Sequence, residues 1–171
     1  MGEVARLLPP EPLTEQHDIG EFSSGEPSLD DWLRRRARAN QASGATRTYV
    51  VCQGRRVVGY HALASGVVAL ESATGRFRRN MPSPVPVAVL ARLAVDREWQ
   101  GRGIGRAMFR DAALRVTHAA DAIGIRGMIV HALSDEAKKF YLALGFEESP
   151  REPMTLMVTL SDIRAVLQGK K

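Results

Sequence analysis

An apolar stripe at helical spacing follows Pro27 and predicts the first main helix. Pro27 suits the first turn of a helix, and Gly44 suits the position just past its end. The stripe leaves the neighbouring arginines on other faces, and it consists of Leu29, Trp32, Leu33 and Ala37. The spacing therefore predicts one continuous helix over residues 27–43.

Helical spacing returns in the second half of the chain. After a glycine-rich turn, Met108 and Val116 mark the buried side of a helix over residues 104–124. A shorter helix over residues 134–145 ends at a glycine. A small helix with a basic tail is expected over residues 161–171.

Strand-like runs lie between these helices. The stretch 87–95 is apolar almost throughout, which is typical of a central strand, and 71–86 is expected to be a loop rich in arginine and proline. The other expected strands cover residues 4–8, 46–53, 56–70, 126–132 and 154–160. This order predicts an α/β fold with one mixed sheet flanked by helices.

Length and composition indicate one domain over residues 1–171. The chain has 171 residues, of which 44% are hydrophobic, enough for a sizeable core. No apolar run reaches the roughly 20 residues that cross a bilayer. The first residues also lack the pattern of a secretory signal. We therefore expect a cytoplasmic protein with no membrane partner.

Cysteine and histidine usage argues against disulfide and metal chemistry. Cys52 is the single cysteine, and it lies in an expected strand, where a buried structural thiol is typical. The four histidines are not spaced as a set of metal ligands. No metal site is predicted.

The net charge of +5 favours a polyanionic partner, which could be a nucleic acid, a nucleotide cofactor or an acidic protein. The arginines gather in two groups. The first group lies on the helix after Pro27 and includes Arg34, Arg35 and Arg38; the second lies in the proline-rich loop and comprises Arg76, Arg78 and Arg79. A solvated basic face is the alternative interpretation for each group.

The segment QGRGIGR, directly after the central strand, indicates an anion-binding loop. It is neither a P-loop, which needs GxxxxGK[ST], nor a GxGxxG dinucleotide fingerprint. Glycines allow close approach of the backbone, helix-start N–H groups point at the anion, and arginines add charge. The candidate residues are Gln100, Gly101, Arg102, Gly103, Ile104, Gly105 and Arg106. A tight turn without a ligand remains the alternative.

This Q-x-x-G-x-G loop resembles the acyl-CoA loop of the GNAT (Gcn5-related N-acetyltransferase) family. A second match is the late A-x-x-F-Y-x-x-x-G-F pattern, made of Ala137, Phe140, Tyr141, Gly145 and Phe146. The resemblance implies a mostly antiparallel sheet with splayed central strands and acetyl-CoA as cosubstrate. It makes Tyr141 the acid that protonates the departing CoA thiolate. Ser134, where many members carry Asn, would cap the helix and contact the cofactor arm.

In such folds the cofactor arm pairs with the backbone of the central strand. The matching residues here are Leu93, Ala94 and Val95, and the N–H near Leu93 would polarise the thioester carbonyl. Arg92 either lines the acceptor side or forms an ion pair. Glu71, Asp96 and Glu98 are candidates for a general base by position only. An α-amine, with a pKa of about 7.7 to 8.0, needs less help than a lysine at about 10.4.

Longer segments resemble the GNAT toxins of bacterial toxin–antitoxin pairs, over roughly residues 5 to 160. The resemblance implies acetylation of the α-amine on charged tRNA, with the arginines, Arg92 among them, on tRNA phosphates. It also implies a homodimer and a ribbon–helix–helix antitoxin, with operator DNA bound only through that complex. Three alternatives stay open: a GNAT enzyme for a protein N-terminus, a lysine or a small amine; a non-catalytic CoA-binding protein; and a nucleic-acid-binding module.

Overall fold

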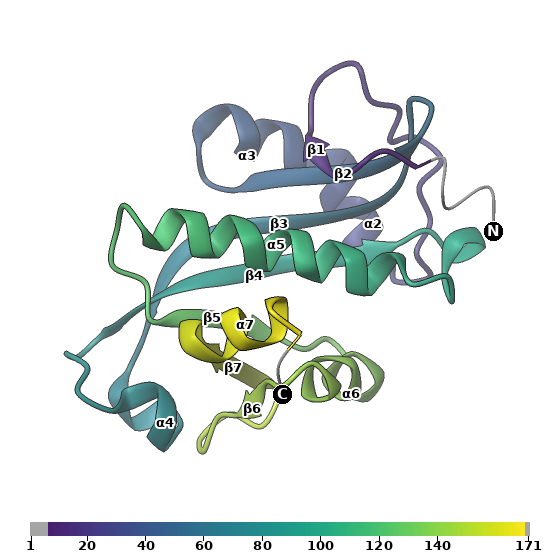
Figure 1. The fold of residues 1–171 in the computed structure, drawn as a ribbon. Helices are drawn as coiled ribbons and strands as arrows, with labels where there is room; N and C mark the ends of the chain where they lie inside the picture. The colour runs from purple at the N-terminus through teal and green to yellow at the C-terminus, as the bar shows by residue number, and fades with distance from the viewer. Residues whose placement is uncertain (1–6, 170–171) are drawn as a thin grey trace. The chain divides into compact units, whose positions relative to one another are not determined.

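The computed structural model describes residues 7–169, and Figure 1 shows their elements in chain order. The helices are α2 (Pro27–Arg35), α3 (Ala37–Ser43), α4 (Gly75–Arg78), α5 (Ile104–Ala120), α6 (Asp135–Ala143) and α7 (Leu160–Leu167), with 3-10 turns at Leu70–Ser72 and Arg97–Trp99. The strands are β1 (Glu11–Pro12), β2 (Arg47–Gln53), β3 (Arg56–Val68), β4 (Val85–Val95), β5 (Gly127–His131), β6 (Glu147–Glu148) and β7 (Thr155–Thr159).

The strands form one mixed sheet in the order β1-β2-β3-β4-β5-β7-β6, which confirms the predicted α/β fold. β2 pairs antiparallel with β1 and β3, and β7 pairs antiparallel with β5 and β6. β4 and β5 are parallel, and their ladder joins Ala88 to Met128 and Val89 to Ile129. β4 continues to Val95, so most of its second half lies beyond the residues that pair with β5. Splayed central strands require that the two strands separate in this way.

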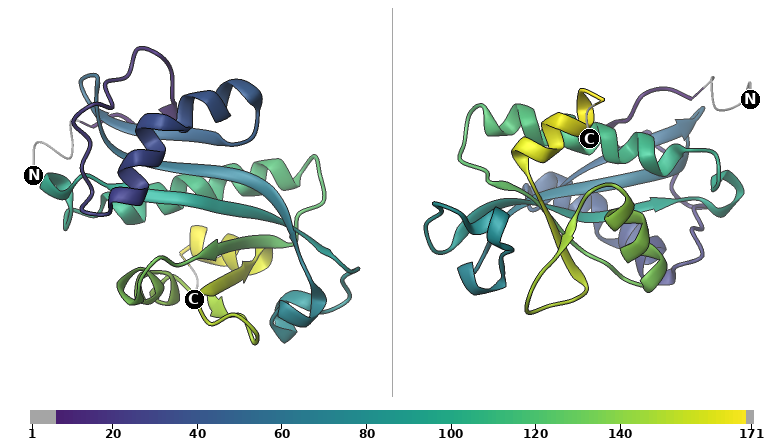
Figure 2. Two further views of the ribbon diagram at one scale, coloured as in Figure 1. Left: turned by 180° about the vertical axis from the view of Figure 1, so that it is seen from behind. Right: turned by 60° about the horizontal axis from the view of Figure 1, so that its bottom comes forward.

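The described residues fall into two compact units, and the first comprises residues 7–64 and 92–112. Within it, α2 and α3 cover one face of the strands and the first turns of α5 cover the other (Figures 1 and 2). Leu33, Tyr60 and Ala94 belong to the core under α2. Ile104 and Met108 belong to the core under α5.

The second unit comprises residues 65–91 and 113–169. Its core joins Phe77 of α4 to Val87, Ile129 and Met157 on neighbouring strands. Gly127 is required here by close packing, because a Cβ at this position would collide with the carbonyl oxygen of Val158. That residues 1–171 form a single domain stays a prediction.

The expected helix over residues 27–43 is interrupted. Arg36 leaves the helical conformation (φ −121°, ψ −31°), so that α2 ends and α3 begins with the buried Ala37. The local sequence does not indicate this break, because no Gly or Pro occurs there and the hydrophobic spacing continues to Ala37. α3 then ends at Gly44, which adopts the left-handed conformation (φ 84°).

Other boundaries also differ from expectation. The loop expected at 71–86 contains α4, because the Thr74 hydroxyl accepts a hydrogen bond from the Phe77 N–H (3.2 Å) and the Phe77 ring is buried. The last helix, α7, begins at Leu160, one residue early, and ends at Leu167. Of the strand expected at 4–8, residues 7–8 are irregular and the rest lie outside the described residues.

Candidate active site

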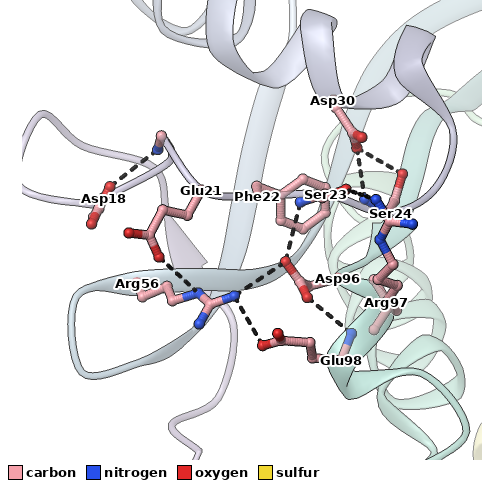
Figure 3. Close-up of polar contacts among 12 residues, drawn as sticks. Asp18, Glu21, Phe22, Ser23, Ser24, Asp30, Arg56, Asp96, Arg97 and Glu98 are labelled. Atoms are coloured by element: carbon pink, nitrogen blue, oxygen red, sulfur yellow. Dashed lines mark hydrogen bonds and ion pairs between the residues drawn. The ribbon is translucent and has the colours of Figure 1, made fainter.

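The approach to the glycine loop is anchored by Asp96, which is 2% exposed (Figure 3). Its carboxylate accepts hydrogen bonds from the N–H groups of Ser23 (3.1 Å) and Glu98 (3.0 Å). It also lies 3.5 Å from the guanidinium of Arg56. These contacts fix the turn after β4 to the segment before α2, so Asp96 acts as an anchor in this structure.

Arg56 is shared among three carboxylates (Figure 3). Besides Asp96, its guanidinium lies 3.3 Å from Glu98 and 4.0 Å from Glu21. Both glutamates are exposed, so they are screened by water and add little stability. Of the other two candidates for a general base, Glu98 is paired with Arg56, and Glu71 is an exposed residue of the 3-10 turn before α4.

The side-chain amide of Gln100 links the same two segments. Its Nε2 donates hydrogen bonds to the carbonyl oxygens of Ser24 and Val95, both at 2.8 Å. On the other side of Ser24, the buried Asp30 accepts from the Ser24 N–H (3.0 Å) and hydroxyl (2.7 Å). Gln100 thus holds the end of β4, where the sequence places the cofactor arm.

The glycines give the loop a conformation that other residues rarely adopt. Gly101 and Gly103 have φ of +79° and +85°, and a Cβ on either would meet open space, so the requirement is conformational. The Ala107 N–H donates to the Gly103 carbonyl (3.1 Å), which begins α5. The N–H groups of the first turn, from Ile104 to Arg106, then have no acceptor within the helix, as is typical of helix starts that bind anions.

The two loop arginines differ in their surroundings. The guanidinium of Arg102 lies 4.6 Å from the centre of the Trp99 ring, and its Nη2 donates to the Glu98 carbonyl (3.1 Å). Arg106 is exposed in the first turn of α5. Both lie beside the helix N-terminus, where a cation strengthens the binding of a phosphate.

The end of β4 presents two chemically different sides. Leu93 and Val95 pack against the core under α5, whereas Ala94 lies in the core under α2. Arg92 is on the α2 side, and its guanidinium lies 5.0 Å from the centre of the Trp32 ring. Because of this contact, Arg92 is held beside α2.

Tyr141 lies in the second unit, on α6. Ser134 caps this helix, since its hydroxyl accepts a hydrogen bond from the Ala137 N–H (3.1 Å), as expected. The Tyr141 side chain is buried and contacts the rings of Phe140 and Phe146 edge to face. Burial raises the pKa of the phenol, so it keeps its proton at neutral pH and can act as an acid.

Besides Arg92, three of the arginines assigned to RNA binding have partners within the chain. Arg34 donates to the Phe22 carbonyl (2.7 Å), and Arg38 donates to the Thr14 carbonyl (3.1 and 3.2 Å). Arg76 forms a two-bond ion pair with Asp162 (2.6 and 2.7 Å). Sequence reasoning missed these partners because they are distant in the chain or are backbone atoms.

The other arginines of the two groups are exposed. Within residues 7–169, no side-chain hydrogen bond or ion pair is found for Arg35, Arg78 or Arg79. A cation that makes no contact in its own protein stays available to an external anion. These three residues, together with the equally exposed Arg36 beside Arg35, are the best candidates for contacts with phosphate.

The remaining chemistry of the described chain is limited. Cys52 is buried, and burial, with a smaller contribution from Glu11, raises the pKa of its thiol to about 11, which makes it unreactive at neutral pH. No cluster of three or more metal-ligating side chains occurs among residues 7–169. Among the same residues, no helix has the length and apolar character needed to cross a membrane.

Comparison with known proteins explains this arrangement. Residues 44–148 match the acetyltransferase (GNAT) domain. The tRNA-acetylating toxin of Mycobacterium tuberculosis (strain ATCC 25618 / H37Rv) is 54% identical over 158 residues, which cover 92% of this chain and 95% of the relative. The match to the toxins therefore extends well beyond the two short motifs.

Solved structures agree in fold. AtaT in complex with acetyl-methionyl-tRNAfMet superposes with a TM-score of 0.86 at 28% identity, covering 94% of this chain and 98% of that one. A mutant AtaT toxin bound to the C-terminus of the antitoxin AtaR and acetyl-CoA gives 0.81 at 28% identity, covering 95% and 98%. The resemblance inferred from the two motifs is confirmed: the chain belongs to the GNAT family of acetyltransferases.

Proposed function

We propose that this chain is the toxin of a toxin–antitoxin pair and transfers the acetyl group of acetyl-CoA to the α-amine of an amino acid on charged tRNA. The observation that carries the proposal is the 54% identity, over 92% of the chain, to a tRNA-acetylating toxin. Acetylation of that amine prevents peptide-bond formation, so the product blocks translation.

The first unit supplies the acetyl-CoA side of the reaction. The N–H groups at the start of α5 and the cations Arg102 and Arg106 bind the pyrophosphate. The backbone at Leu93, Ala94 and Val95 pairs with the cofactor arm. The N–H near Leu93 donates to the thioester carbonyl oxygen and stabilises the negative charge that develops there.

Tyr141 supplies the acid. The amine nitrogen attacks the thioester carbon, a C–N bond forms, and the C–S bond breaks. The departing sulfur takes the proton of the Tyr141 hydroxyl, which burial keeps protonated. The α-amine attacks in its neutral form, which is well populated because its pKa is only about 7.7 to 8.0. After the attack, the nitrogen releases a proton to water, and the Tyr141 phenolate regains a proton from water.

The partners follow from the same proposal. Arg35, Arg78 and Arg79 contact tRNA phosphates, which adds affinity without base specificity. The toxin works in the cytoplasm as a homodimer, and a ribbon–helix–helix antitoxin covers it. Operator DNA is bound only through that complex.

Acetyl transfer from labelled acetyl-CoA tests the proposal directly. The acceptors are a mixed pool of charged tRNA, the same pool uncharged, and a cell protein extract. We expect label only with charged tRNA, and a loss of at least about 100-fold in Tyr141→Phe, because the general acid is removed. Tyr49→Phe, a matched loss of a hydroxyl on β2, should retain activity.

Other outcomes identify the alternatives. Label in the protein extract alone would assign a protein N-terminus or a lysine as acceptor and contradict the tRNA substrate. Binding of CoA without transfer to any acceptor would indicate a non-catalytic GNAT protein.

A further inference from the structure

Trp32 is held as a flat, partly exposed ring on α2. It packs against the core under α2 and stacks on Tyr60, with ring centres 5.9 Å apart and planes within 8° of parallel. Tyr60 is itself fixed, because it is fully buried and its hydroxyl donates to the Leu29 carbonyl (2.7 Å). The ring of Trp32 therefore has little freedom to reorient.

One cation lies next to this ring, and two more follow it in the chain. The guanidinium of Arg92 lies 5.0 Å from its centre. Arg35 follows three residues later, one turn along the same side of α2, and the Arg36 N–H donates to the Trp32 carbonyl (2.8 Å). Arg35 and Arg36 are exposed, and among residues 7–169 neither side chain has a hydrogen bond or ion pair.

The two acidic residues of α2 contact other groups. Asp30 is buried and accepts hydrogen bonds from Ser24, and Asp31 lies 3.5 Å from Arg34. A partly exposed aromatic ring with a guanidinium 5.0 Å from its centre and two exposed arginines nearby is a combination that suits single-stranded RNA. Bases stack on the planar groups, and phosphates bind the cations.

We propose that Trp32 and Arg92 form a stacking platform for a base in the single-stranded 3′ end of the acceptor RNA, with Arg35 and Arg36 on the adjoining phosphates. This inference rests on the proposed tRNA substrate. Arg92 directly precedes Leu93, so the platform lies beside the backbone assigned to the thioester. Figure 2 shows α2 lying on this face of the strands within the first unit. The platform positions the aminoacyl end and takes no part in proton transfer.

Tryptophan fluorescence tests the platform, because the chain has only two tryptophans and Trp99 is buried. The probe is a short single-stranded RNA ending in CCA, titrated without acetyl-CoA and compared with an abasic RNA of equal length. We expect the CCA RNA to quench wild-type fluorescence and the abasic RNA to leave it unchanged. Trp32→Leu should abolish the quenching and weaken binding, measured with a labelled RNA, by about 10- to 100-fold.

Arg92→Lys provides a variant that spares the aromatic core. It keeps the charge and loses the planar guanidinium, so binding should weaken several-fold, whereas Arg97→Lys should match wild type. Equal affinity for base-containing and abasic RNA, or unchanged RNA binding in Trp32→Leu, would overturn the inference and leave the ring to a protein partner.

The two proposals fail separately. If wild type acetylates charged tRNA but RNA binding ignores Trp32, only the platform is wrong. If the CCA RNA quenches Trp32 but charged tRNA is never acetylated, only the proposed reaction is wrong. Circular dichroism spectra of each variant show whether a loss comes from unfolding.

Discussion

At the scale of single residues, arginines from the same region of the chain have different surroundings. Arg38 and Arg35 are three positions apart, yet Arg38 binds backbone carbonyls of the segment before α2 and Arg35 is exposed. A charge that is used inside the fold contributes to stability. A charge that faces solvent and has no partner in the fold remains available for an external ligand.

This difference predicts that two alanine substitutions affect different properties. Arg38→Ala should lower the free energy of unfolding by about 2 kcal/mol, because charged hydrogen bonds to the Thr14 carbonyl are lost. Arg35→Ala should leave stability within about 0.5 kcal/mol and weaken tRNA binding. For Arg35→Ala, a plot of log affinity for tRNA against log salt concentration should also be less steep than for wild type. Urea unfolding and tRNA titration measure both. Equal effects of the two substitutions on stability would contradict the assignment.

At the scale of elements, the glycine loop depends on backbone conformation more than on space. Gly103 has φ +85°, and its carbonyl accepts the first hydrogen bond of α5. A side chain at this position raises the cost of the left-handed conformation. The N–H groups that would bind pyrophosphate then lose their alignment.

Gly103→Ala should therefore cost about 1–2 kcal/mol of stability and raise the KM for acetyl-CoA. Gly75→Ala is the matched control, because Gly75 starts α4, has open space around it and lacks a positive φ. It should leave KM unchanged and keep or slightly raise stability. An unchanged KM in Gly103→Ala would show that the loop does not need this conformation to bind its ligand.

Elements also show how far the sequence could predict this protein. The long strands and α5 were predictable because their hydrophobic periodicity is strong, and the family was predictable from the two short motifs that contain the glycine loop and Tyr141. The break at Arg36 and the helix α4 were not, since each depends on a tertiary contact: Ala37 and Phe77 are buried. The ion pair between Arg76 and Asp162 joins residues 86 positions apart, which no local pattern reveals.

At the scale of the whole molecule, buried ionisable groups couple stability to pH. Cys52 and Tyr60 in the first unit and Tyr141 in the second all have raised pKa values, chiefly because burial disfavours their charged forms. Asp162 shows the opposite shift, because the hydrogen bond from Arg76 lowers its pKa. Both extremes of pH should therefore destabilise the fold.

The alkaline side gives the sharper test. Below pH 9, the ordinary value for the Cys52 thiol, folded and unfolded chains are both protonated at this site and its stabilising contribution is complete. Between pH 9 and about 11, only the unfolded thiol loses its proton, so stability falls by up to about 1.4 kcal/mol per pH unit. The two tyrosines add to the loss above pH 10, their ordinary value.

Urea unfolding of wild type and Cys52→Ala from pH 8 to pH 10 isolates the cysteine. The variant loses some packing at every pH, but its stability should decline less steeply from pH 9 to pH 10 than that of wild type, because only the tyrosines then contribute. Parallel curves for the two proteins would mean that the thiol ionises in the folded state as readily as in the unfolded chain. In that case the strand β2 would have to open to solvent without global unfolding, and hydrogen exchange at Val51 and Cys52 would be fast.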